Sequence, residues 1–466
     1  MKRLSRQLKV LLFAAAALLA PVAGVSSAAR AADRKPNIVL ILADDLGYAD
    51  VSFNGRREWT TPNLHRLANE GTIFRRWYTA GVVCAPARAA LMTGRYGIHN
   101  GVTGNGSLDL PAEEVTLAEA LKPHGYATAL FGKWHHGAPR PGKDAYTHPM
   151  DQGFDEFFGF TNATDAHQKF PRELWEGREK RPSEGFADDL FTDRALDFIK
   201  RHKDAPFFLH VPYIAPHGRP AAPQEEIDAL KGKFREKDPA NPSNARYAAD
   251  IVRMDKSVGR ILRALEDHDL NDNTIVIFTS DHGATFERLS EFAPVYFDSN
   301  RPFRGQKRTL WEGGMRVPAV VRWTGKLPGR TDSREVVHMC DVFPSLLAAA
   351  GIRPDDALKL DGANVLDVWR GKAKTPDRTL YWEWREGGDT QLAAMRGDLK
   401  MVITGNNKPE LFNVEIDPAE RRTLSAELPL ELKSLRDGLD QWLATETDAA
   451  KQRRRPRGAT APAGEE

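Results

Sequence analysis

Cys84 and Arg88 have the spacing most indicative of chemistry in this sequence. Cys84 is followed by Ala85, Pro86 and Ala87, and further alanines follow Arg88. Because proline suits the first turn of a helix and alanine propagates one, Cys84 is predicted to lie at a helix N-terminus. Arg88, four residues later, would share its helix face. The helix dipole and the guanidinium would then both stabilise negative charge that develops at the Cys84 side chain.

Acidic residues form a second pattern. Asp44 and Asp45 follow the first apolar run of the chain, and Asp281 and His282 follow a later one. Adjacent carboxylates repel one another unless a cation neutralises them, and hard oxygen ligands favour Ca²⁺ or Mg²⁺. An Asp pair alone also fits a solvated turn or a helix cap. A second acid at another strand end favours a metal site instead.

Basic residues follow two further apolar runs, with Lys133 and His135 after one and His217 after the other. Short apolar runs that end in polar turns are typical of buried parallel strands, and helical spacing separates these runs. This alternation predicts a sheet with helices on both faces, in which ligands bind at the carboxyl ends of the strands. The predicted strands are 38–42, 126–131, 206–211 and 274–279, and the predicted helices are 116–121, 187–201 and 247–265.

The order and type of these motifs resemble one enzyme family. The stretch 84–88, Cys-x-Pro-x-Arg, resembles the signature of the sulfatases, in which the cysteine is converted to formylglycine; the family usually has serine where this chain has Ala87. Gly-Lys-Trp-His at 132–135, Pro-His at 216–217, Gly-x-Lys at 305–307 and Glu-Gly-Gly at 312–314 resemble further family elements, in the family's order. The resemblance covers roughly residues 35–420 and implies an alkaline phosphatase-like fold and hydrolysis of sulfate monoesters.

The resemblance also implies a role for each matching residue. The metal and two lysines would clamp the sulfate oxygens. One hydroxyl of the hydrated aldehyde would attack sulfur with the aid of Arg88, His217 would assist the departing alcohol, and His135 would be the base that releases sulfate. Many relatives have Asn where this chain has His282. The implied catalytic residues are Cys84, Arg88, Lys133, His135, His217 and Lys307, and the implied ligands of one Ca²⁺ are Asp44, Asp45, Cys84, Asp281 and His282.

Length and composition indicate a folded protein with two cores. A hydrophobic fraction of 41% with 28% charged residues is typical of globular chains, and a formal net charge of +2 gives no basis for nucleic-acid binding. A chain of 466 residues usually needs a second core. The expected fold is α/β, with a large mostly parallel sheet between helices over 32–370. A small domain with an antiparallel sheet and a helix would follow over 371–450, and a disordered tail over 451–466.

The first residues have the pattern of an export signal. Basic residues precede an apolar run at 10–20, and Ala29-Arg30-Ala31 fits a cleavage site. The run is shorter than the ~20 apolar residues that span a bilayer, so a signal peptide over 1–31 is favoured over a membrane anchor. We expect an exported protein, periplasmic or secreted, without stable membrane insertion. A disulfide between Cys84 and Cys340 is the alternative use of its two cysteines, although a buried free thiol also suits Cys340.

Two other functions compete with sulfate ester hydrolysis. A phosphoester or phosphonate monoester hydrolase of the same superfamily would bind a tetrahedral anion of similar size. A catalytically silent carbohydrate-binding relative would keep the fold, but the complete set of catalytic residues argues against it. Export favours a sulfated carbohydrate as the substrate, and conversion of Cys84 requires a formylglycine-generating or maturation enzyme as a partner.

Overall fold

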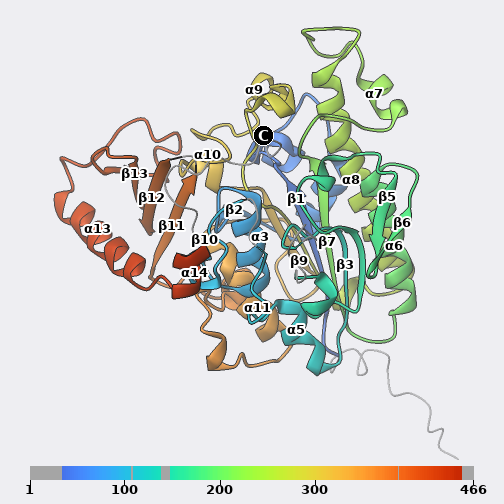
Figure 1. Cartoon of the computed structure of the whole chain (residues 1–466), viewed down its shortest axis with the longest axis horizontal. Helices are drawn as coiled ribbons and strands as arrows, with labels where there is room; N and C mark the ends of the chain where they lie inside the picture. The colour runs from blue at the N-terminus through green and yellow to red at the C-terminus, as the bar shows by residue number, and fades with distance from the viewer. Residues whose placement is uncertain (1–33, 106–108, 138–146, 387, 454–466) are drawn as a thin grey trace, which may run out of the picture. The chain divides into compact units, whose positions relative to one another are not determined.

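Ten strands form a mixed, mostly parallel sheet (Figure 1). The computed structural model describes residues 34–105, 109–137, 147–386 and 388–453, and contacts group the chain from Lys35 onward into one unit. Neighbours among β8, β1, β7, β3 and β4 are parallel, whereas β9 runs antiparallel to both β2 and β8. In spatial order the strands are β10 (Thr331–His338), β2 (Thr72–Tyr78), β9 (Ala319–Trp323), β8 (Thr274–Ser280), β1 (Asn37–Asp44), β7 (Phe207–Pro216), β3 (Ala127–Lys133), β4 (Glu156–Phe160), β5 (Glu173–Glu176) and β6 (Glu179–Pro182).

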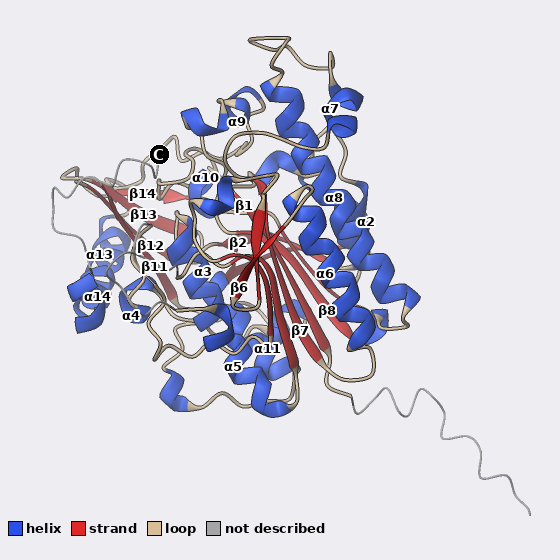
Figure 2. Ribbon diagram, turned by 45° about the vertical axis from the view of Figure 1, so that its right-hand side comes forward, coloured by secondary structure: helices blue, strands red, loops and turns tan. Residues whose placement is uncertain are grey.

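Helices cover both faces of this sheet (Figure 2). Successive side chains of a strand point to opposite faces, so Val39 and Ile41 of β1 enter one core while Leu40 and Leu42 enter the other. Helices α2 (Pro62–Glu70), α6 (Ala187–Arg201) and α8 (Ser243–Asp267) close the first core, and α3 (Cys84–Thr93), α5 (Leu117–Leu121) and α11 (Val342–Ala349) close the second. The predicted α/β architecture is confirmed. Shorter helices are α4 (Gly97–Asn100), α7 (Gln224–Leu230), α9 (Ala293–Tyr296), α10 (Glu312–Met315) and α12 (Leu366–Trp369).

A second, four-stranded antiparallel sheet follows in the chain, as predicted (orange and red in Figure 1). Trp382 on one face packs with Val82 and Val83, the residues that precede Cys84, and Ala394 on the other face packs with the apolar side of α13. This sheet therefore packs against the residues that lead into α3. Its elements are β11 (Thr379–Glu386), β12 (Asp389–Arg396), β13 (Leu399–Thr404), β14 (Glu410–Asn413) and α13 (Pro429–Ala444).

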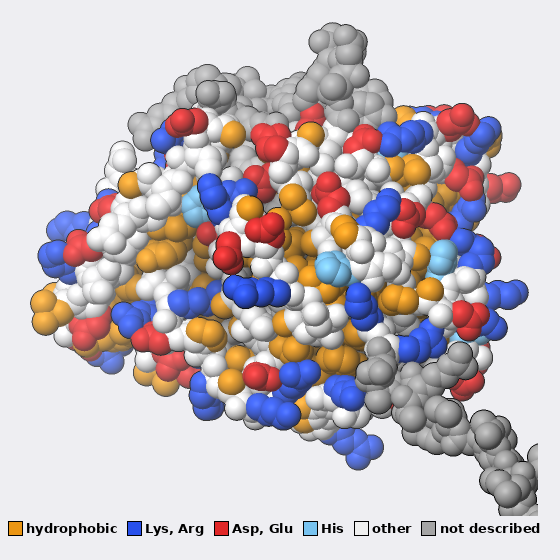
Figure 3. Space-filling model, turned by 90° about the horizontal axis from the view of Figure 1, so that it is seen from below, with side chains coloured by type: hydrophobic (Ala, Val, Ile, Leu, Met, Phe, Trp, Pro, Cys, Tyr) orange, Lys and Arg blue, Asp and Glu red, His pale blue; other side chains and the backbone are white. Residues whose placement is uncertain are grey.

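The predicted terminal segments are described only in part. The expected tail begins at Lys451 within α14 (Asp448–Arg453), and its remainder lies outside the described residues, as does the expected signal peptide, 1–31. None of the helices in the described residues is both long and apolar enough to cross a bilayer. Acidic and basic side chains intermingle on the face shown in Figure 3, which accords with the small net charge of the chain.

Candidate active site

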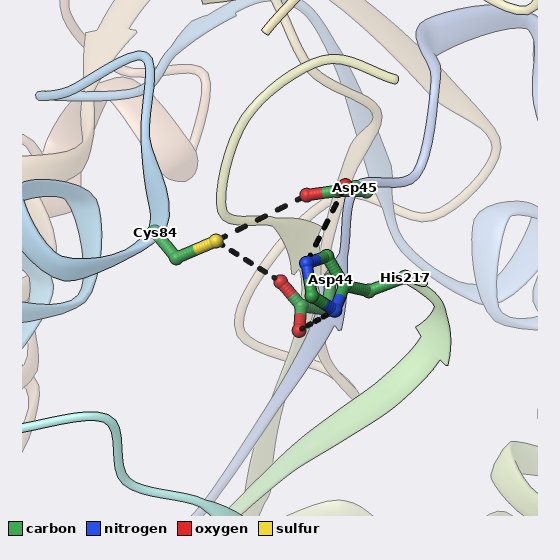
Figure 4. A group of neighbouring side chains, drawn as sticks. All are labelled: Asp44, Asp45, Cys84 and His217. Carbon is green, nitrogen blue, oxygen red and sulfur yellow. Dashed lines mark hydrogen bonds and ion pairs between the residues drawn. The ribbon is translucent and has the colours of Figure 1, made fainter. Parts of the chain in front are cut away.

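Cys84 is the first residue of α3 and is 1% exposed, so the predicted position at a helix N-terminus is confirmed. Its Sγ atom lies 3.5 Å from Asp44 Oδ1, 4.0 Å from Asp45 Oδ1 and 3.2 Å from His282 Nε2. Figure 4 shows the side chains of Asp44, Asp45 and His217 converging beside Cys84. Cys84 and Cys340 are both free, so no disulfide joins them. Burial and the carboxylates of Asp44 and Asp281 raise the pKa of the Cys84 thiol, although the nearby lysines oppose the change.

Three buried carboxylates meet at this point. In a regular strand, Asp44 and Asp45 would point to opposite faces. The register between β1 and β7 shifts just before Asp44, and Asp45 has a left-handed φ of 61°, which brings both side chains to the same site. Asp281 follows β8, and its Oδ1 atom accepts the backbone N–H of Asp45 at 3.1 Å. The sequence therefore identified three acids that the fold brings together.

Three buried cations pair with these carboxylates and balance their formal charge. A balanced set is required because an uncompensated charge in a protein interior is strongly destabilising. The guanidinium of Arg88 bridges two of the acids, and each lysine contacts one. The distances are Arg88 Nη2 to Asp281 Oδ2, 3.0 Å; Arg88 Nη2 to Asp44 Oδ1, 3.2 Å; Lys133 Nζ to Asp44 Oδ2, 2.6 Å; and Lys307 Nζ to Asp45 Oδ1, 3.0 Å. We call these six residues the charge cluster.

Neighbouring residues of opposite charge stabilise the ionised forms of Asp44 and Lys307. Burial alone would raise the pKa of Asp44, but Lys133, His217 and Arg88 outweigh it and hold that pKa well below its ordinary value. Burial works against the charged form of Lys307, yet the neighbouring Asp45 raises its pKa above the usual range. Asp44 and Lys307 are consequently both ionised at neutral pH and present fixed charges to any ligand.

The donor set fits a hard divalent cation. Asp44 and Cys84 belong to two overlapping groups of potential ligands, one completed by Asp45 and His217 and the other by Asp281 and His282, with ligand atoms within 4.8 Å of one another in each. Each group contains a pair of carboxylates with a histidine and a cysteine, and carboxylate oxygens are the ligands that Ca²⁺ prefers. Because the six charged residues are already balanced, a divalent cation would give the site a net positive charge suited to an anion.

Two histidines flank the cluster. His217 follows β7, with Nδ1 3.7 Å from Asp44 Oδ2 and Nε2 3.9 Å from Asp45 Oδ2. His135 follows β3 in a left-handed conformation, φ 78°, and no described residue is hydrogen-bonded to its Nδ1 atom. Burial, followed by the charge of Lys133, lowers the pKa of His135 well below its ordinary value, and burial also lowers that of His217. Both rings are therefore neutral at pH 7 in the free protein.

His282, a predicted ligand, and two further residues also lie around the site. His282 faces Cys84 and contacts the Gly283 carbonyl through Nδ1 at 3.0 Å. Gly283 must lack a side chain, because a Cβ atom there would overlap the carbonyl oxygen of Gly313. The ring of His167, on the short helix η5 (Asp165–His167), lies 4.7 Å from that of His217.

Several residues around the site carry no sequence signal. Asn105 Oδ1 accepts the Ala85 N–H at 3.0 Å and so caps the helix that begins with Cys84. Thr79 donates to the carbonyl of Asp281 at 2.5 Å. Gln391 of β12 binds the backbone on both sides of Thr309, accepting from Leu310 N at 2.9 Å and donating to Arg308 O at 3.1 Å. These partners are distant in sequence, so only the fold reveals them.

Comparison with known proteins agrees with this geometry. Residues 36–352 match the family model described as Sulfatase, and residues 304–445 match that described as N-sulphoglucosamine sulphohydrolase, C-terminal. N-acetylgalactosamine-6-sulfatase of Homo sapiens is 36% identical over 84% of this chain and 76% of its own length. The crystal structure of Ps i-CgsB in complex with k-i-k-neocarrahexaose superposes with a TM-score of 0.81 at 29% identity, covering 89% of this chain and 94% of that one. The chain belongs to the sulfatase family.

As a member of that family, the protein is a sulfuric ester hydrolase. The phosphonate monoester hydrolase of Agrobacterium radiobacter also shares the fold, with a TM-score of 0.61 at 22% identity over 90% of this chain and 96% of that one. The same fold therefore also occurs in a hydrolase of phosphonate esters.

Proposed function

We propose that this sulfatase hydrolyses sulfate esters of a carbohydrate by means of a formylglycine made from Cys84 and one bound Ca²⁺. The observation that carries the proposal is the position of the Cys84 side chain, at a helix N-terminus and 3.5 Å from Asp44 within the charge cluster. The similarity to N-acetylgalactosamine-6-sulfatase and to a protein crystallised with neocarrahexaose supports a carbohydrate substrate.

The charge cluster would bind the anionic part of the substrate. Asp44, Asp45 and Asp281 would hold Ca²⁺, with Cys84 and His282 beside them, and the bound ion would supply positive charge that neutralises the sulfate oxygens. Lys133 and Lys307 would provide further positive charge next to those oxygens. Arg88, which bridges Asp44 and Asp281, would keep these two carboxylates in place.

In the first step, a hydroxyl of the hydrated aldehyde at position 84 attacks sulfur with the aid of Arg88, forms the new oxygen–sulfur bond and releases its proton to the solvent. The bond between sulfur and the alcohol oxygen breaks, and the bonding electrons leave with that oxygen. We assign to the N–H groups of His217 and Lys307 the stabilisation or protonation of the departing oxygen. A neutral His217 serves as a hydrogen-bond donor, and the anionic substrate would favour its protonation.

In the second step, the remaining hydroxyl at position 84 loses its proton and the aldehyde re-forms. The bond between carbon and the sulfate oxygen breaks, and sulfate leaves. His135 is the proposed proton acceptor, which agrees with its neutral state and the absence of a described partner at Nδ1. Water then restores the hydrated aldehyde. Oxidation of the Cys84 thiol to the aldehyde is assigned to a separate maturation enzyme.

The proposal is tested with matched esters. Initial rates are measured on aryl sulfate and aryl phosphate esters of the same phenol, and then on N-acetylgalactosamine 6-sulfate and neocarrahexaose. We expect the sulfate ester to react faster, with release of sulfate from at least one sugar. A clear preference for the phosphate ester would instead favour a phosphoester or phosphonate ester hydrolase.

We further propose that the protein is exported to the periplasm or the medium. The basic residues and apolar run at the start of the sequence support this localisation. N-terminal sequencing of protein recovered from the periplasm and medium of its host should give a start near Ala32. A chain that starts at Met1 and sediments with membranes would contradict cleavage.

A further inference from the structure

A second group of buried charges lies outside the charge cluster, behind the strand end that carries His217. It consists of Lys169, Asp188 and Asp250, which are 5%, 0% and 0% exposed. Asp188 lies in the first turn of α6, and Asp250 lies on α8. Lys169 Nζ is 2.7 Å from Asp250 Oδ2. We call these three residues the Lys169 group.

The Lys169 group binds the backbone just before His217. Asp188 accepts the N–H of Ile214 through Oδ1 at 3.0 Å and the N–H of Ala215 through Oδ2 at 3.1 Å. Lys169 donates to the carbonyl of Ile214 at 2.9 Å. That same carbonyl accepts the backbone N–H of His217, also at 2.9 Å. The side chains of Asp188 and Lys169 therefore fix the turn from which His217 projects.

The fold explains why this turn needs side-chain partners. On one side of β7, the pairing with β3 ends at His210, while β7 continues to Pro216 and stays paired with β1 on its other side. Buried backbone groups on the side that β3 no longer covers must find other hydrogen-bond partners. Burial raises the pKa of Asp188 to about 7, and both of its oxygens accept backbone N–H groups at this turn. The side chain of Asp188 therefore supplies hydrogen-bond partners that β3 does not provide at this end of β7.

Lys169 also links the turn to the ring that packs on His217. It lies two residues after His167, whose ring is 4.7 Å from that of His217. The segment that carries His167 is thus joined to the turn before His217 through the side chain of Lys169. A proton or hydrogen-bond donor acts only within about 2.6–3.2 Å of its target. A displacement of about 1 Å can cost about 10²-fold in rate.

We propose that Asp188 is a positioning residue that holds His217 in reach of the departing alcohol oxygen. The inference rests on the role proposed above for His217. Asp188 itself would not contact the substrate. Its effect would be largest for substrates whose leaving alcohol is a poor leaving group, because those substrates depend most on a well-placed donor.

The experiment compares kcat/KM over a series of aryl sulfates whose phenols differ in acidity. His217→Ala is the reference, Asp188→Asn the test, and Asp250→Asn the matched control, because Asp250 belongs to the same buried group without contacting the turn. We expect Asp188→Asn to steepen the dependence on leaving-group acidity as His217→Ala does, with about 10²-fold loss on the poorest leaving group. Asp250→Asn should keep the wild-type slope.

The outcomes separate the inference from the proposed function. If His217→Ala steepens the dependence and Asp188→Asn lowers all rates equally, Asp188 is only structural and the inference is overturned. If His217→Ala leaves the slope unchanged, the proposed role of His217 fails and the inference fails with it. Asp188→Glu, which keeps the charge but displaces the carboxylate, guards against a misfolded Asn variant. It should also steepen the slope, and a wild-type slope in this variant would overturn the inference.

Discussion

Replacement of Arg88 by methionine tests how the charge cluster is balanced. Methionine preserves much of the side-chain volume but removes the cation that bridges Asp44 and Asp281. The formal charge of the six-residue cluster then falls from zero to −1. Removing one partner of a buried ion pair costs about 3–5 kcal/mol. For a folded unit of about 430 residues, at about 2.1 cal/mol/K per residue, this corresponds to a Tm lower by roughly 3–6 °C.

Calcium should reduce that loss. A cation that binds only the folded state stabilises it by mass action, and a cluster with one more negative charge binds the cation more strongly. We expect the full decrease in Tm in a chelating buffer and a smaller one in saturating Ca²⁺. Both proteins are produced without a maturation enzyme, so that position 84 is cysteine in each. Arg88→Lys keeps the charge without the bridging geometry and should lie between the wild type and Arg88→Met. Equal decreases with and without Ca²⁺ would refute the coupling of Arg88 to a bound cation.

Three further predictions concern the surroundings of the site. Lys133→Met should lower kcat/KM by about 10²–10³-fold because it removes a buried charge beside the anion, and a loss below tenfold would place the anion elsewhere. Gln391→Leu should lower kcat without a large change in Tm, because it removes two hydrogen bonds to the backbone that follows Lys307. An unchanged kcat would show that these hydrogen bonds do not position Lys307. Burial raises the pKa of Asp250 to about 6. The folded state then binds this proton more tightly than the unfolded state, so stability falls as pH rises from about 4 through 6. Relative to the wild type, Asp250→Asn should gain about 3 kcal/mol of unfolding free energy between pH 4 and pH 8 in chemical denaturation, and a constant difference would contradict the raised pKa.

The sequence predicted the strand-end part of the site well. Asp44, Asp45, Asp281 and His217 all lie at or just after the carboxyl ends of buried strands, and such ends of neighbouring parallel strands must meet at one edge of a sheet. Helical spacing also placed Arg88 near Cys84 correctly. Its partners did not follow from that spacing, because Asp281, which it binds, is supplied by a distant strand.

The rest of the site depends on contacts that leave no local pattern. Lys307 lies in a loop and was identified only by resemblance, and the structure shows that Gln391 of the second sheet supports the following residues. Asp188 is one of two consecutive acids in the first turn of α6, where acidic residues are common for electrostatic reasons alone. Only the path of β7 in the structure reveals that the side chain of Asp188 binds the turn before His217.

The chemical state of residue 84 tests the central claim most directly. Mass spectrometry of the tryptic peptide 77–88, taken from fully active protein of the native host, measures this state. The account predicts the mass loss expected when the CH₂SH group of Cys84 becomes an aldehyde, together with labelling by a hydrazide. An intact thiol in fully active protein, or a bridge from Cys84 to Cys340, would contradict it.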